Sequence, residues 1–226
     1  MRRVLVLAGI AATCVVAASP AWATNECRGL MVCVPVAGPW VLASPGQIEY
    51  QLACPKRYIV AGLDAELTNR GIDVGFVGKL GSPVNPGITT TAEAVFLGRL
   101  ARGRDSAASF RPHIGCVPAQ GGGQRTPTAF HPYPPGQPTV RHALDVKIRP
   151  GRTTTRVARC ARTERLVGAT HAIGFYGDAP PRAPLIGAVH VRQEVRGGTV
   201  RLRVAAGREL LGTRTVVQLD LLCTPR

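Results

Sequence analysis

Asp64 and Glu66 are the best-placed pair of acids for chemistry in this sequence, because they lie two positions apart in a stretch that reads as a β-strand. Alternate residues of a strand project to one face, with their Cα atoms roughly 6.6 Å apart. Glycosidases use paired carboxyl groups near that separation. Asp73 lies nearby in the sequence and offers a third oxygen ligand for calcium. A solvent-facing strand accounts for the same acids, so a secreted glycoside hydrolase is the weaker hypothesis.

Other catalytic or metal-binding motifs are missing from the sequence. There is no Gly-x-Ser-x-Gly elbow, and no glycine-rich phosphate loop follows a strand. No cysteines or histidines lie at the spacing of a zinc site. His113, three residues before Cys116, is expected to fill a strand face and not to act as a base. We therefore expect a non-enzymatic protein without a cofactor or metal.

Positive charge is the strongest chemical signal in the chain. The formal net charge is +15, and residues 141–226 contain 16 basic and 6 acidic residues. Four arginines of this half surround a Gly197-Gly198 pair that predicts a hairpin turn, and a hairpin would gather them on one solvent-facing side: Arg192, Arg196, Arg201 and Arg203. Isolated exposed charges are screened beyond about 8 Å, so only such a cluster would matter.

These arginines predict binding to an anionic cell-envelope polymer or an acidic protein. Nucleic acid is not expected, because the aromatic residues do not interleave with the basic ones. Two alternatives stay open. The first is that the arginines reflect the amino-acid composition of the protein and not a binding site, since only three of the basic residues are lysines. The second is that the protein is an enzyme inhibitor or protein-interaction module that presents proline-rich loops such as residues 82–86.

The cysteines predict a disulfide framework. Six lie beyond the N-terminal apolar run. Cys54 to Cys116 spans 62 residues and Cys160 to Cys223 spans 63, and each closing cysteine is followed by one residue and a proline. If the two spans are copies, each closes its own unit, which leaves Cys27 and Cys33 to pair across a short loop. We predict the disulfides 27–33, 54–116 and 160–223.

The same comparison predicts an internal repeat. Cys54 and Cys160 are each followed eight positions later by glycine, and Gly75-Phe76-Val77-Gly78 matches residues 174–177. Alternating apolar residues broken by Gly, Pro and Asn indicate short strands. We predict an all-β protein of two tandem, disulfide-stapled, antiparallel, sandwich-like units, which either form two small domains or share a pseudo-symmetric core. The Cys-Pro opening is similar to that of small exported bacterial β-domains in general, and it implies no activity.

The sequence also predicts the boundaries. Arg2 and Arg3, an apolar run over residues 4–18 and the small residues at 21 and 23 indicate a signal peptide over 1–23. We therefore expect a secreted or cell-envelope protein with no transmembrane segment after cleavage. Residues 24–117 form the first unit, including the Cys27–Cys33 loop. Residues 118–139, ten of them Pro or Gly, form a linker, and residues 140–226 form the second unit.

Overall fold

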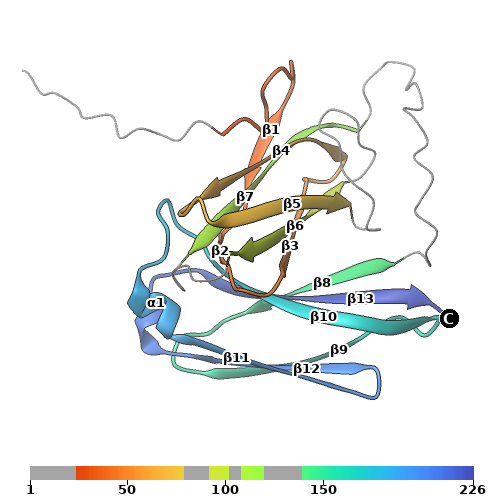
Figure 1. Cartoon of the computed structure of the whole chain (residues 1–226), viewed down its shortest axis with the longest axis vertical. Coiled ribbons are helices and arrows are strands. Elements are labelled where there is room, and N and C mark those ends of the chain that lie inside the picture. Colours follow the sequence, from red (N-terminus) through yellow and green to blue (C-terminus); the bar gives the residue numbers. More distant parts are fainter. Residues whose placement is uncertain (1–23, 79–91, 102–107, 120–138) are drawn as a thin grey trace, which may run out of the picture.

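A computed structural model of the chain describes residues 24–78, 92–101, 108–119 and 139–226 (Figure 1). The predicted signal peptide, nearly all of the predicted linker and the 82–86 loop lie outside the described residues. The described part consists of thirteen strands, one short helix and one 3₁₀ turn. All of the strand pairings are antiparallel, which confirms the predicted fold class.

The first half of the chain builds two sheets. β7 lies between β1 and β4, and a separate sheet has the order β3-β6-β5. The bounds are β1 (Val34–Ala37), β2 (Trp40–Leu42), β3 (Ile48–Ala53), β4 (Tyr58–Leu67), β5 (Ile72–Gly78), β6 (Glu93–Leu100) and β7 (Ser109–Pro118).

The second half repeats this arrangement. β13 lies between β8 and β10, and the separate sheet has the order β11-β12-β9. The bounds are β8 (Val140–Lys147), β9 (Thr153–Arg159), β10 (Glu164–Phe175), α1 (Ala183–Gly187), β11 (Val189–Arg196), β12 (Thr199–Ala206), η1 (Arg208–Leu210) and β13 (Thr215–Pro225). Taken in chain order, β1 and β3 to β7 correspond to β8 to β13.

The strand register shows the repeat in detail. Cys116 lies opposite Val60, and Cys223 lies opposite Leu166. Directly after these pairs, both ladders shift by one residue, at Gly62 and at Gly168. A local bulge at the same place in both halves is a feature that a shared ancestor would leave.

One part of the predicted repeat is wrong. Gly75 and Phe76 lie in β5, whereas Gly174 and Phe175 lie in β10, the counterpart of β4. The two Gly-Phe-x-Gly segments therefore occupy different positions in the two halves. Four residues with two fixed glycines are too short a pattern to establish an alignment, and the cysteine registers determine it instead.

The three disulfides have the predicted pairing. Cys54–Cys116 joins β7 to the residue that directly follows β3, and Cys160–Cys223 joins β13 to the residue that directly follows β9, with Cα–Cα distances of 5.8 and 5.9 Å. Cys27–Cys33 closes a short loop that precedes β1. In the loop-closure model each long bridge stabilises the fold by about 4 kcal/mol and the short one by about 2 kcal/mol.

The two halves are joined through a continuous sheet. β2 pairs with β7 of the first half and with β10 of the second, where Val41 lies opposite Phe110 and Gly174. Ala172 and Val216 of the second half belong to the same apolar core as the first half's aromatic residues. In Figure 1 the second half lies below the first, and the β11-β12-β9 layer lies at the far end. The halves therefore share a sheet and part of a core.

Candidate functional site

The paired acids Asp64 and Glu66 lie on β4, where the register sets them opposite His113 and Arg111 of β7. Residues directly opposite in adjacent strands project to the same face, so these four side chains gather on one side of the sheet. Glu66 Oε2 is 3.4 Å from His113 Nε2 and 3.7 Å from an Arg111 terminal nitrogen. The sequence predicted the shared face of the two acids, but not their basic partners.

The N-terminal segment covers part of this face. The Asn25 amide donates a hydrogen bond to Asp64 Oδ2 at 2.6 Å. Glu26 is buried, and its Oε1 lies 3.6 Å from His113 Nδ1. His113 is therefore enclosed between two glutamates, one from the N-terminal segment and one from β4. Sequence periodicity could not find Glu26, because it belongs to no strand.

Two opposed glycines make room for this segment. Gly62 lies opposite Gly115, and a Cβ built on either would lie 1.6 or 2.1 Å from the Glu26 carbonyl oxygen. Such distances are far below van der Waals contact, so the segment can pack here only over glycine. The facing Gly62 and Gly115 were the available sequence signal for a covering segment.

The arrangement favours a structural role for these acids. Asp64 accepts from the Asn25 and Ala65 amides, and Glu66 faces His113 and Arg111, so the oxygens anchor the N-terminal segment. Asp73 does not join them: it lies on β5, in the other sheet, and forms an exposed ion pair with Arg99 at 3.7 Å. The proposed calcium ligands are therefore not brought together.

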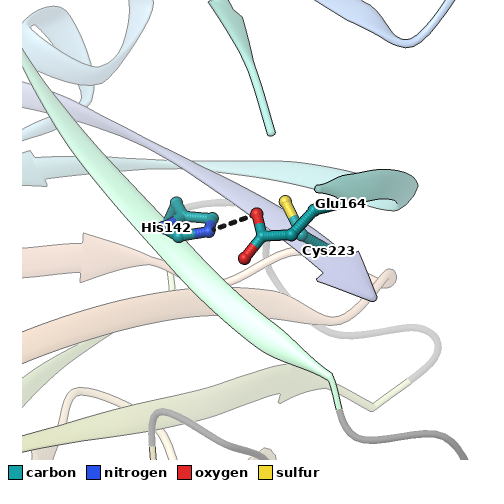
Figure 2. Close-up of side chains that lie close together, drawn as sticks. All are labelled: His142, Glu164 and Cys223. Carbon is teal, nitrogen blue, oxygen red and sulfur yellow. Dashed lines mark hydrogen bonds and ion pairs between the residues drawn. The ribbon is translucent and has the colours of Figure 1, made fainter. Parts of the chain in front are cut away.

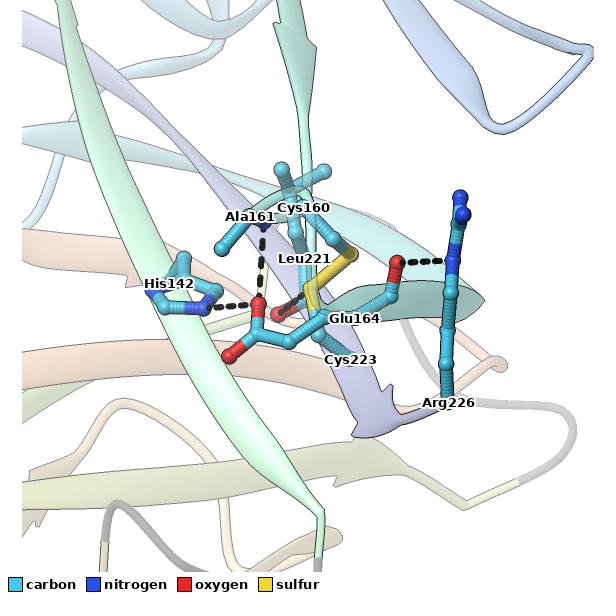
Figure 3. Close-up of a disulfide and its surroundings, with 7 residues drawn as sticks. All are labelled: His142, Cys160, Ala161, Glu164, Leu221, Cys223 and Arg226. Carbon is cyan, nitrogen blue, oxygen red and sulfur yellow. Dashed lines mark hydrogen bonds and ion pairs between the residues drawn. A yellow bond between two sulfur atoms is a disulfide. The ribbon is translucent and has the colours of Figure 1, made fainter.

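A second cluster, which the sequence did not reveal, lies at the start of β10. His142, Glu164 and Cys223 place their ligand atoms within 4.8 Å of one another (Figure 2). His142 Nε2 lies 2.9 Å from Glu164 Oε2. The Cys223 sulfur, however, is bonded to Cys160 (Figure 3) and so is not a thiolate ligand.

In this oxidised form Glu164 organises the turn that follows Cys160. Its Oε2 accepts the Ala161 amide at 3.0 Å, and its carbonyl accepts Arg226 Nε at 3.1 Å (Figure 3). The Ala161 hydrogen bond, and then His142, lower the pKa of the Glu164 carboxyl below its ordinary value. The first half carries Val36 and Tyr58 at the corresponding register positions. The duplicated fold therefore does not require the His–Glu pair, which is specific to the second half.

The predicted arginines lie together on the β11–β12 hairpin. Gly197 and Gly198 form its turn, both with positive φ (54° and 74°), as a two-residue type I′ turn requires. Arg192 lies opposite Arg203, and Arg196 lies opposite Thr199. β9 adds a fifth arginine to the same side, since Arg159 also lies opposite Thr199. We call this surface the arginine face: Arg159, Arg192, Arg196, Arg201 and Arg203.

The arginine face is strongly cationic and open to solvent. Its five arginines are all exposed, while Val200, Leu202 and Val204 on the other side of β12 are buried. Glu194 is the one acid on this side of the three strands, and its Oε1 lies 3.3 Å from Arg192 Nε. No described residue forms an ion pair with the other four arginines.

A groove of about 650 Å³ lies beside this surface, between the edge strands β8 and β9; we call it the β8–β9 groove. It is lined by four cations, three threonines and one acid: Lys147, Arg149, Arg152, Arg156, Thr153, Thr154, Thr155 and Asp145. Sequence reasoning missed it, because the groove forms where two edge strands of different sheets face each other. A smaller hollow of about 540 Å³ near α1 is lined by fewer charged residues.

Comparison with known proteins gives no functional information. No protein-family model matches the chain, and neither a curated protein nor a solved structure matches it. Among the described residues, no helix is long and apolar enough to cross a membrane.

Proposed function

We propose that this protein is an exported, non-enzymatic binding module, and that its arginine face binds an anionic polymer of the cell envelope. The observation that carries the proposal is the direct cross-strand pairing of Arg192 with Arg203. Like charges directly opposite in a sheet destabilise it. A strand face that needed only to be soluble would avoid this repulsion with Thr or with an acid.

The geometry suits a repeating anion. Neighbouring strands lie about 4.8 Å apart, and same-face residues of one strand recur roughly every 6.6 Å. These spacings fall within the Debye length of about 8 Å at physiological salt, so the charges reinforce one another. Several weak contacts from one rigid face add up through multivalency, as an extended polymer requires.

The test compares two variants of equal net charge. The face variant carries Arg→Gln at the five positions of the arginine face. The control variant carries Arg→Gln at five exposed arginines elsewhere: Arg28, Arg57, Arg70, Arg162 and Arg182. Both are co-sedimented with purified cell envelope over a salt series, after thermal melting has shown that they are folded.

We expect the parent and the control variant to bind with a steep salt dependence, and the face variant to bind weakly with a flattened one. If the two variants bind the envelope equally well, the arginines of the face reflect the amino-acid composition of the protein and not a binding function. Absence of envelope binding by the parent would overturn the proposal.

A second function, inhibition of a protease, is favoured by the Cys27–Cys33 loop. Met31 is fully exposed (102%) and Val32 is 62% exposed, within a ring closed by the disulfide. A constrained loop that displays apolar side chains has little ordering entropy to lose on binding. The test is to measure inhibition of serine proteases that cleave after apolar residues. A Met31→Ser variant should lose this inhibition and still bind the cell envelope.

A further inference from the structure

We propose that the β8–β9 groove is a selective subsite for a phosphate group together with the hydroxyls of its polyol or sugar carrier. The inference rests on the proposed function: the arginine face would bind an anionic polymer, and the groove would decide which one. Four features of the groove support this proposal: its cations, its hydroxyl and backbone hydrogen-bond donors, one carboxylate held in place, and the size and non-aromatic character of its lining.

Within the part of the chain that the structure describes, the cations of the groove are not used in ion pairs. Lys147, Arg149, Arg152 and Arg156 form no ion pair with any described residue. Arg156 lies opposite the fully buried Leu202, so it occupies the core-facing side of β9, but at the sheet edge it is exposed. An inward charge on an edge strand also blocks unwanted strand addition. That role explains Arg156, but not the three cations that lie before β9 begins.

The groove also offers neutral hydrogen-bond donors. Thr153, Thr154 and Thr155 line it with hydroxyl groups, which both donate and accept. Among the described strands β9 pairs only with β12, so its other side presents backbone amides that no described strand pairs with. Tetrahedral phosphate oxygens match arginine, hydroxyl and amide donors together.

Asp145 is the residue that distinguishes between anionic ligands. Its Oδ1 accepts a hydrogen bond at 2.9 Å from Nε2 of Gln218, and the Gln218 side chain also bonds the Gln51 carbonyl at 3.1 Å. Because Gln218 is buried, this carboxylate has a fixed position. A carboxylate repels a ligand that carries only anionic groups, whereas it accepts hydrogen bonds from hydroxyls. The ligand should therefore carry hydroxyls beside its phosphate.

The lining and size narrow the class further. None of the eight lining residues is aromatic, so the groove has no platform on which nucleobases could stack. Its volume of about 650 Å³ lies within the range of small-molecule sites, roughly 300–1,000 Å³. One polyol-phosphate or sugar-phosphate repeat fits this range better than a folded partner.

The groove is continuous with the arginine face. Thr155 lies opposite Arg203, and Thr153 lies opposite Ala205, so these groove threonines share the outer side of the β11-β12-β9 sheet. A polymer seated in the groove would continue over the arginines. The face supplies affinity for any polyanion, and the groove supplies selectivity.

The experiment measures binding to three immobilised polymers of matched length: polyglycerol phosphate, inorganic polyphosphate and polyglutamate. We compare the parent, the face variant, a groove variant with Arg149→Gln, Arg152→Gln and Arg156→Gln, and the single variant Asp145→Asn. Asp145 is exposed, and asparagine still offers an oxygen to Gln218, so this variant retains the fold.

We expect the parent to prefer polyglycerol phosphate by about tenfold over polyglutamate, a difference of about 1.4 kcal/mol. The groove variant should lose this preference, and the face variant should bind all three polymers more weakly to a similar extent. Asp145→Asn should gain affinity for polyphosphate relative to polyglycerol phosphate. If the parent binds all three equally, or if the groove variant keeps the preference, the groove inference is wrong while the arginine face remains. If the parent binds none of them and no envelope, the proposed function fails as well.

Discussion

At the scale of single residues, Gly62 and Gly115 allow the N-terminal segment to reach His113. Their missing side chains let the Glu26 carbonyl approach the β4–β7 ladder, and Glu26 then lies beside the imidazole. The second half has Gly168 at the position that corresponds to Gly62, but Leu222 in place of Gly115. Only the first half therefore accepts a covering segment in this way.

We predict that Gly62→Ala destabilises the protein by about 1–3 kcal/mol, because the new methyl group overlaps the Glu26 carbonyl. Urea unfolding measures the free energy, and hydrogen exchange at the Asn25 amide reports whether the segment detaches from Asp64. Gly168→Ala is the matched control: its nearest neighbour, Leu222 Cβ, lies at 3.9 Å, an ordinary contact. Equal effects of the two substitutions would show that the covering segment does not constrain Gly62.

Tyr50 gives a prediction about alkaline pH. Burial, and then Tyr176 and Asp145, raise the pKa of its phenol well above the ordinary value. Above about pH 10 the unfolded chain releases this proton while the folded protein retains it, so stability falls as the pH rises, by up to about 1.4 kcal/mol per pH unit.

The check is urea unfolding from pH 8 to pH 11 with the parent and Tyr50→Phe. Phenylalanine removes the hydrogen bond to Tyr176, so the variant should be less stable than the parent by about 1 kcal/mol at pH 8. This deficit should shrink and then reverse above pH 10. A deficit that stays constant up to pH 11 would contradict the assigned pKa shift.

Residue types alone predicted part of the candidate sites. Strand parity was sufficient to bring Asp64 and Glu66 to one face, and Arg192 and Arg203 to another. Strand parity could not predict the position of Glu26 beside His113, because Glu26 lies in a loop and not in a strand.

Among the strands and their connections, the sequence predicted those features that depend on local residue patterns and on the spacing of the cysteines. Matched cysteine spans gave the disulfides, and Gly197-Gly198 gave the β11–β12 hairpin. The pairing of β9 with β12 is non-local, so Arg159 was not recognised as part of the arginine face. The β8–β9 groove was missed for the same reason. The groove lies between edge strands of two different sheets, and the repeat in the sequence does not indicate how these two strands are placed relative to each other.

At the scale of the whole molecule, the sequence left open whether the repeated units form two domains or share a core. β2 decides this, because its three residues pair with both halves. A three-residue strand has too little periodicity to predict. Arg141 and Glu49 add a buried ion pair across the junction, with Nε and Oε2 at 2.7 Å. Two hydrogen bonds link the same halves: the Gln51 amide donates to Gln218 Oε1, and the Gln51 carbonyl accepts from Gln218 Nε2.

These contacts predict the outcome of cutting the chain between the halves. A protease site placed within residues 120–138 should yield two fragments that stay together under native conditions, because β2 and the shared core remain intact. Gel filtration before and after denaturation measures the association. Two fragments that separate while remaining folded would show that the halves are independent domains.

The same cut protein tests the buried ion pair. Arg141→Leu leaves Glu49 as a buried charge without its partner, and removing one member of such a pair costs about 3–5 kcal/mol. We therefore expect the cut Arg141→Leu protein to dissociate at a lower urea concentration than the cut parent. Adding Glu49→Leu removes the stranded charge and should restore much of the association, since apolar replacements of a buried pair are often neutral. If the double variant dissociates as readily as the single one, the side chains contribute through their shape and hydrogen bonds, and the charge pairing does not hold the halves together.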